Sequence, residues 1–188
     1  MNNKMNIHLA LDDQAIGVCR EVNQAIRRVA PSIIVFDEMS PMIPHISLAM
    51  GRAMAAAFAT AIPGILERLA KAATPIRFGL RTPYLEDVRG RYVFAELEAP
   101  PEFFSLREVV RDQVVRDSLM ELQNDYTPVP HITLAHVEEN GSEVSAFLST
   151  VRMPPSITAV ALEYSDVGPK GTCLGSLYTV PFRRPSDR

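Results

Sequence analysis

The chain has 188 residues, of which 47% are hydrophobic and 22% charged, the ordinary composition of a globular protein with its own core. Its net charge of −3 argues against wrapping a long nucleic acid, which relies on many phosphate contacts. No apolar run approaches the ~18 residues of a membrane span, and the first thirteen residues lack a secretory pattern. We therefore expect a compact soluble protein, with residues 1–188 forming a single domain.

The first half of the chain alternates between strand and helix patterns. The predicted strands are residues 5–11, 33–36 and 44–50. Asp12 or Asp13 can cap a helix whose apolar residues recur at helical spacing until Pro31 ends the run. Residues 53–73 are predicted to be helical with an interruption, because Pro63 is expected to begin a second helix rather than to lie inside one.

The second half repeats this alternation. The predicted strands are residues 76–80, 92–97, 130–135, 157–164 and 175–182. Ser105 and Glu108 have capping-box spacing and predict a helix that runs to about Gln123, and a short helix is expected near residues 142–149. Residues 168–172 lie between predicted strands and are interpreted as a hairpin loop. A β-α-β-β type of unit therefore occurs twice, which predicts an α+β fold.

The most informative feature is a six-residue sequence that occurs twice. Residues 44–49 read Pro-His-Ile-Ser-Leu-Ala, and residues 130–135 read Pro-His-Ile-Thr-Leu-Ala. The single difference exchanges one hydroxyl residue for another. Such self-similarity indicates a duplicated architecture, and the β-branched residue and the preceding proline favour a short strand in both copies.

The strand period divides each copy into a chemical and a packing face. Because alternate side chains point to opposite faces, His45 and Ser47 share one face while their apolar neighbours point into a core. His131 and Thr133 are arranged in the same way. Two such strands side by side would suit a phosphodiester hydrolase that uses no metal. One neutral histidine would serve as general base, one protonated histidine as general acid, and the two hydroxyls would hold phosphate oxygens.

The paired His-x-Ser/Thr motifs at His45 and His131 resemble those of the 2H phosphoesterase superfamily. The bacterial 2′,5′ RNA ligase-like, or cyclic nucleotide phosphodiesterase, branch is the most similar. The second copy, preceded by Tyr126-Thr127-Pro128-Val129, is the stronger match, and Ser47 stands where many members have Thr. The resemblance implies a bilobal, pseudo-twofold fold, in which two antiparallel-rich sheets line a central cleft and the helices lie outside.

The same resemblance implies an enzyme. It would hydrolyse, or reversibly ligate without ATP, the 2′,3′-cyclic phosphate or 2′-5′ phosphodiester bond of a nucleotide or an RNA end. No cofactor and no membrane association are expected. Two other functions stay open. One is a non-catalytic nucleotide- or RNA-binding protein of the same fold, and the other is a metal-dependent hydrolase with the histidines as ligands.

Five further residues are candidates for contact with the substrate. His8 alternates with apolar neighbours and therefore points toward the cleft side of its strand. Tyr84 and Tyr126 offer rings on which a base could stack. Arg91 belongs to an arginine-rich stretch in a chain with 16 Arg and 3 Lys, and a guanidinium suits a phosphate. Lys170 lies in the predicted hairpin loop and could reach the cleft mouth.

The remaining histidine and the cysteines have structural interpretations. His136 lies five residues after His131, so a regular strand sends it to the opposite face unless a bulge intervenes. We interpret it as structural and predict no metal site, because neither motif contains a carboxylate. Cys19 and Cys173 form no Cys-x-x-Cys, which favours a reduced cytoplasmic setting, although a disulfide between them is not excluded by the sequence.

Overall fold

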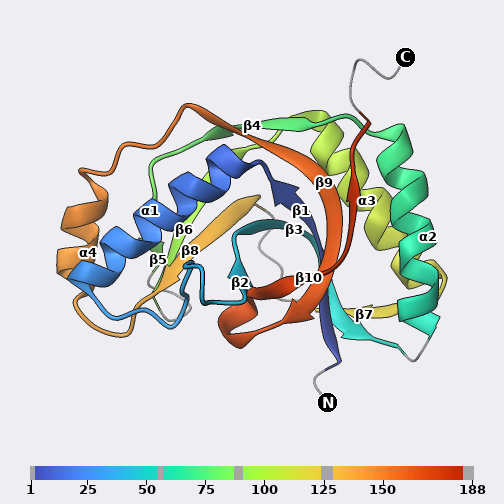
Figure 1. Cartoon of the computed structure of the whole chain (residues 1–188), viewed down its shortest axis with the longest axis horizontal. Helices are drawn as coiled ribbons and strands as arrows, with labels where there is room; N and C mark the ends of the chain where they lie inside the picture. The colour runs from blue at the N-terminus through green and yellow to red at the C-terminus, as the bar shows by residue number, and fades with distance from the viewer. Residues whose placement is uncertain (1–2, 55–56, 87–90, 124–128, 184–188) are drawn as a thin grey trace.

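The computed structural model describes residues 3–54, 57–86, 91–123 and 129–183 (Figure 1). Its strands are β1 Lys4–Leu11, β2 Met42–Ile43, β3 His45–Ala53, β4 Ile76–Leu80, β5 Tyr84–Glu86, β6 Tyr92–Glu98, β7 Met120–Leu122, β8 His131–His136, β9 Ser156–Val167 and β10 Cys173–Pro181. Its α-helices are α1 Asp13–Val29, α2 Ala57–Ala72, α3 Pro101–Arg116 and α4 Gly141–Leu148. A 3₁₀ turn, Pro169–Gly171, joins β9 to β10 where the hairpin loop is predicted.

The strands form two antiparallel layers that are hydrogen-bonded to each other through β4. The first contains β7, β3, β1, β9 and β10, with the short β2 on β10, and the second contains β5, β6 and β8. β4 pairs with β9 along most of its length and with β6 only at Gly79 and Leu80. The curled sheet lies between two helical groups, α1 with α4 and α2 with α3 (Figure 1). The predicted α+β fold is confirmed.

The repeated unit predicted from the sequence is present in the fold. β1, α1 and β3 form the first unit, and β6, α3 and β8 form the second; in both, the two long strands pair antiparallel. The helices are exchanged between the units, because α1 contacts β8 and α3 contacts β3. Each motif strand is therefore covered by the helix of the other unit, which holds the two motif strands in one core.

β3 carries a β-bulge in the middle of its motif. Ile7 of β1 pairs with Ala49, whereas the next residue, His8, pairs with Ser47, so that Leu48 is the extra residue. Leu48 and Ala49 are both fully buried, two consecutive core positions that a regular alternating strand would not provide.

β8 carries a bulge at the same motif position. Val93 of β6 pairs with Ala135 and Phe94 pairs with Thr133, so that Leu134 is the extra residue. Leu134 and Ala135 are again both fully buried. The duplication therefore extends from the sequence to the irregularity of the strand.

The bulge changes the face on which His136 lies. His136 pairs with Tyr92, which shares a face with Phe94 two residues along β6, and Phe94 pairs with Thr133. His136 therefore lies on the same face as Thr133 and His131, and the expectation that it points to the opposite face is wrong. Its ring stands edge-on to that of Tyr92, with the centroids 4.7 Å apart.

The predicted strand at residues 33–36 is wrong. Only an isolated bridge at Ser32 is formed there, although Ile34 and Phe36 are buried as a strand pattern requires. The buried side chain of Asn23 takes the place of a neighbouring strand. Its Nδ2 donates to the Ile34 carbonyl at 3.0 Å, and its Oδ1 accepts from the Phe36 amide at 3.0 Å. A side chain satisfies these backbone groups, so no ladder is needed.

The boundaries of two helices also differ from the prediction. α2 begins at Ala57 and continues through Pro63, because the buried apolar face that includes Ile62 and Leu66 stabilises one continuous helix. α3 begins at Pro101, not at Ser105, since proline is well suited to the first helical position. It ends at Arg116, and β7 occupies the residues predicted to be its last turn.

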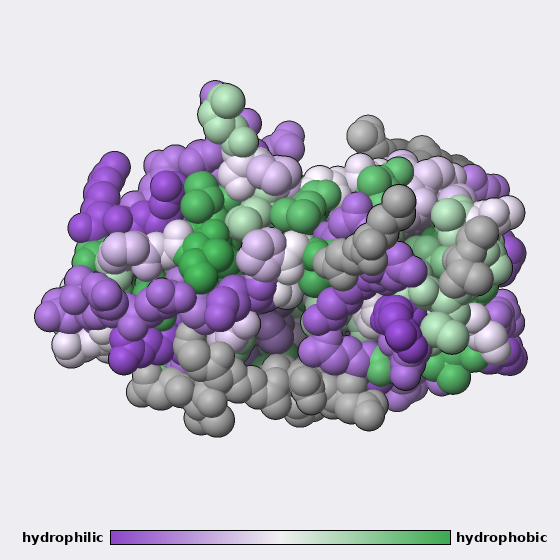
Figure 2. Space-filling view, turned by 90° about the horizontal axis from the view of Figure 1, so that it is seen from below, coloured by the Kyte–Doolittle hydropathy of each residue, from purple (hydrophilic) through white to green (hydrophobic). Residues whose placement is uncertain are grey.

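The structure also describes the two cysteines and the surface. Cys19 and Cys173 are both buried free thiols, so no disulfide joins them. Within the described part of the chain, no helix is long and apolar enough to cross a membrane. The face shown in Figure 2 is mostly hydrophilic, and its hydrophobic side chains form small separate groups.

The close approach of β7 to β3 requires a glycine at position 51. A Cβ at Gly51 would overlap the backbone carbonyl of Glu121, whereas a Cβ at Gly17 in α1 has no atom within 4 Å. We expect Gly51→Ala to lower the free energy of unfolding by about 1–3 kcal/mol. Gly17→Ala, the matched control, should raise it by about 0.5–1 kcal/mol. Urea unfolding of both variants measures the difference, and equal stability of the two would contradict the packing at β7.

Candidate active site

His45 is the first residue of β3, and its ring is anchored to the backbone. Its Nδ1 lies 3.0 Å from the carbonyl oxygen of Ile43, two residues earlier. A carbonyl can only accept, so Nδ1 carries the proton and donates it to that bond. In a neutral ring this leaves the lone pair on Nε2. His45 is 9% exposed and lies at the edge of the core.

His131 is the first residue of β8 and is anchored in the same way. Its Nδ1 lies 3.0 Å from the carbonyl oxygen of Val129, again two residues earlier. The same tautomer follows, with Nε2 available for proton transfer. His131 is more exposed than His45. Both motifs therefore supply an imidazole whose orientation and tautomer are set by the motif's own backbone.

The charge of His131 affects the pKa of His45. The pKa of His45 is lowered from 6.5 to about 4, mainly by burial and also by the positive charge of His131, while the hydrogen bond to Ile43 opposes the shift. Burial also lowers the pKa of His131, while the Val129 carbonyl and the Glu86 carboxylate oppose that shift. β3 and β8 are in contact. The structure thus brings the two rings, far apart in sequence, close enough for their charges to interact.

The two motif hydroxyls lie beside the histidines, and both are partly exposed. Ser47 Oγ accepts a hydrogen bond of 2.8 Å from Nδ2 of Asn6, a fully buried residue of β1. Thr133 pairs with Phe94 on β6. Asn6 is not among the residues predicted from the sequence. Its spacing of two residues from His8 places it on the same face of β1, a signal that could have indicated its position.

An aromatic cluster lies against His131. The ring of Phe94 is 4.3 Å from the His131 ring, and the ring of Tyr84 is 6.3 Å from that of Phe94, edge-on. Tyr84 is 43% exposed, while Phe94 is buried. The structure therefore connects Tyr84, through Phe94, to the second motif histidine, and it leaves part of the tyrosine open to solvent.

His8 lies behind His45 and away from solvent. Its side chain is completely buried, and its ring centroid is 5.2 Å from that of His45. His8 does share the face of the first motif, as its alternation with apolar neighbours predicts, because it pairs with Ser47. Its surroundings differ from those of an open substrate contact.

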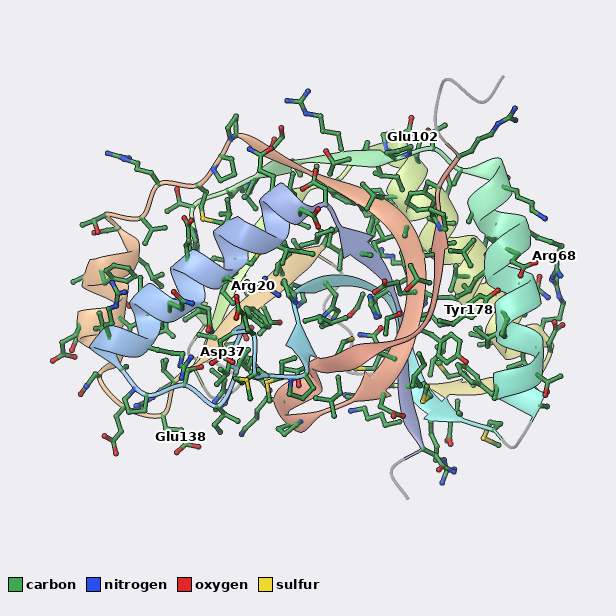
Figure 3. All side chains as sticks on the ribbon, viewed as in Figure 1. Arg20, Asp37, Arg68, Glu102, Glu138 and Tyr178 are labelled. Carbon is green, nitrogen blue, oxygen red and sulfur yellow. The ribbon has the colours of Figure 1, made fainter. Side chains whose placement is uncertain are left out.

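The other candidate contacts are not placed beside the motif histidines. Arg91 precedes β6 at the end that pairs with His136, and its guanidinium donates to the carbonyl of Glu138. Glu138 lies beyond the end of β8, at the lower left of Figure 3. Lys170 is exposed in the 3₁₀ turn and is close enough to lower the pKa of His136, after burial. Tyr126 lies outside the described residues.

Among the described residues, no group of three or more His, Cys, Asp or Glu side chains could hold a metal ion. The two motif histidines have a backbone carbonyl and aromatic or imidazole rings as their neighbours. What this arrangement offers chemically is a pair of Nε2 atoms and a pair of hydroxyls on two strands in contact. Such groups can move protons and donate hydrogen bonds to an anion.

Comparison with known proteins gives no match from the sequence but several matches from the structure. No protein-family model and no curated protein matches this sequence. TT0787 of Thermus thermophilus is 20% identical over 97% of this chain and 99% of that chain, with a TM-score of 0.67. E. coli LigT in complex with 3′-AMP is 18% identical over 96% and 98%, with a TM-score of 0.62. Usb1 of Kluyveromyces marxianus is 10% identical over 96% and 99%, with a TM-score of 0.53.

These solved structures cover nearly the whole chain at low identity, so they establish its fold. The fold is that of a two-unit α+β protein with one His-x-Ser/Thr strand in each unit. This is the 2H phosphoesterase fold, and the resemblance predicted from the paired motifs is confirmed at the level of the fold.

The influence of His131 on the pKa of His45 can be measured directly. Replacing His131 by Gln removes the positive charge that opposes protonation of His45, so the pKa of His45 should rise from about 4. The measurement is a pH titration of the His45 imidazole signals by NMR in both proteins. An unchanged His45 titration would show that the two rings do not face each other.

Proposed function

We propose that this protein is a metal-independent phosphoesterase that acts on a 2′,3′-cyclic phosphate or a 2′-5′ phosphodiester bond of a nucleotide or an RNA end. The observation that carries this proposal is the identical anchoring of two imidazoles. In both motifs Nδ1 bonds a backbone carbonyl at 3.0 Å, which directs Nε2 to proton transfer. Two such groups, with Ser47 and Thr133 beside them, supply what in-line attack at phosphorus requires.

The two histidines have different environments, and this supports different roles. With a pKa of about 4, His45 is neutral at neutral pH and suits the general base that takes a proton from the attacking water. Burial also lowers the pKa of His131, but the Val129 carbonyl and the Glu86 carboxylate oppose that shift and favour the protonated form, which suits the acid that protonates the leaving ribose oxygen. Ser47 and Thr133 would donate to the non-bridging oxygens. In reverse, the same groups join a cyclic phosphate to a hydroxyl.

A nucleotide substrate is supported by the aromatic cluster and by the comparisons. Tyr84 is partly exposed beside Phe94, and a base could stack on its ring. LigT, whose fold this chain shares, has been solved with 3′-AMP, NADP+ and ATP. We keep Arg91 and Tyr126 as proposed substrate contacts, but not His8, because its side chain is completely buried behind His45. We also keep the cytoplasmic setting expected from the sequence.

The mechanism predicts the effect of removing either motif histidine. His45→Ala and His131→Ala should each lower the rate of hydrolysis of a 2′,3′-cyclic nucleotide by about 100-fold or more, because each loses one proton-transfer group. EDTA should have no effect. The rates are measured by chromatography of the nucleotide monophosphate product. Arg68→Ala is the control, since Arg68 lies on α2 at the outer side of the molecule (Figure 3).

The outcome separates this proposal from its alternatives. Full activity in either histidine variant would exclude the two-histidine mechanism. Loss of wild-type activity with EDTA would instead favour a metal-dependent hydrolase. Binding of nucleotide without turnover of any cyclic or 2′-5′ phosphodiester would favour a binding protein of the same fold.

The assignment of base and acid predicts the pH dependence of kcat/KM, which reports the free enzyme. Activity should fall below a pH of about 4, where His45 becomes protonated and can no longer accept a proton. It should also fall as the pH rises through the pKa of His131, which lies below 6.5. We therefore expect a bell-shaped profile with its maximum on the acidic side of 6.5. A maximum above a pH of about 8 would contradict the assignment.

A further inference from the structure

The two units place different rings against their motif histidines. His8 of β1 pairs with Ser47, and Phe94 of β6 pairs with Thr133, so the two residues are equivalent in the repeat. The Phe94 ring lies 4.3 Å from that of His131, and the His8 ring lies 5.2 Å from that of His45. The second unit uses a hydrocarbon ring at this position, whereas the first uses an imidazole.

The neighbour of His8 on its other side is a carboxylate. Glu163 of β9 pairs directly with His8 and is 9% exposed. His8 Nδ1 lies 3.9 Å from Glu163 Oε2, while Glu163 Oε1 accepts a hydrogen bond of 2.7 Å from Thr179 of β10. At the equivalent position of the second unit, β5 places Tyr84 opposite Phe94. Both members of the His8–Glu163 pair are thus particular to the first unit.

Packing alone does not account for an imidazole at position 8. Its side chain is completely buried, and neither ring nitrogen makes a hydrogen bond of ordinary length and angle among the described residues, although the backbone of Leu9 is near enough to oppose the effect of burial on the pKa of His8. An unsatisfied buried polar group costs free energy, while a phenyl ring would fill the same space without that cost. The second unit shows that the fold accepts a phenylalanine there. The nitrogen atoms of His8 therefore need a chemical explanation.

We propose that His8 and Glu163 are positioning residues for His45. The buried carboxylate, acting through the neutral His8 ring, stabilises the positive charge that His45 acquires when it takes a proton from water. This rests on the proposed role of His45 as the general base. No proton leaves His45 for His8 in this step. The Nδ1–H group of His8 turns toward Glu163. The 3.9 Å distance between His8 Nδ1 and Glu163 Oε2 then shortens to that of a hydrogen bond as the positive charge forms on His45.

The electrostatics around His8 are consistent with a neutral ring. Burial, and after it the charge of His45, hold the pKa of His8 well below its ordinary value. Burial raises the pKa of Glu163, and the hydrogen bonds from Thr179 and Ser176 oppose that rise. The titratable groups that face this pair are His45 of β3, Cys173 of β10 and, beyond His45, His131 of β8.

The experiment compares Glu163→Gln, His8→Phe and the double variant. Two quantities are measured: the pKa of His45 by NMR, which needs no activity, and kcat and KM for a 2′,3′-cyclic nucleotide. Glu163→Gln should lower the pKa of His45, because it removes a negative charge that favours the imidazolium. It should also lower kcat roughly 10-fold with little change in KM. In the His8→Phe background, the same change should have a smaller effect, because the carboxylate then acts on His45 only through space and without the polar ring between them.

Glu67→Gln is the matched control. Glu67 of α2 accepts a hydrogen bond of 2.6 Å from Tyr178 of β10, away from His8, so this variant should keep the wild-type pKa of His45 and the wild-type kcat. If Glu163→Gln leaves the His45 titration unchanged, the proposal is overturned, even if the protein proves to have no activity. If His8→Phe does not fold, Glu163→Gln alone still decides. A failure of the proposed function would instead appear as full activity in His45→Ala.

Discussion

The fold and the candidate site both depend on the register of two strand pairs, β3 with β1 and β8 with β6. A bulge at Leu48 and another at Leu134 interrupt the alternation at the same motif position. The register places each motif's histidine and hydroxyl on one face and its isoleucine and leucine in the core. A slip of one residue would exchange these faces, so burial of the apolar set also orients the chemical set. The packing of the core and the orientation of the candidate catalytic side chains thus depend on the same strand pairing in each unit.

The duplicated ladder makes the differences between its halves informative. Both histidines are anchored through Nδ1 to the carbonyl two residues earlier, so the motif itself determines their tautomer. The neighbours of the two histidines differ. The ring of His45 is almost fully buried beside His8. The ring of His131 is more exposed and lies near Phe94 and the negative charge of Glu86. Two groups of the same type can therefore hold a proton with different affinities, which acid–base catalysis requires.

Most of the fold was predictable from local patterns, and the errors have a common cause. The helix at α1 and the motif strands follow from spacing and capping signals that act within a few residues. The segment 33–36 has the apolar pattern of a strand, yet the side chain of Asn23, from the preceding helix, satisfies its backbone. Likewise, the apolar face of α2 outweighs the local preference of Pro63, and the bulge in β8 returns His136 to the face of His131. Each of these three errors reflects a contact beyond the local segment, whereas the start of α3 at Pro101 follows from a local preference.

The sequence by itself determined the duplication, the strand period of the motifs and the pairing of histidine with hydroxyl, because these depend on neighbouring residues alone. Only the tertiary structure decided what lies next to each histidine. Asn6 beside Ser47 and Glu163 beside His8 come from strands that are distant in sequence, and their positions depend on how the sheet curls. The deep burial of His45, which is the main cause that lowers its pKa to about 4, also arises from that long-range packing.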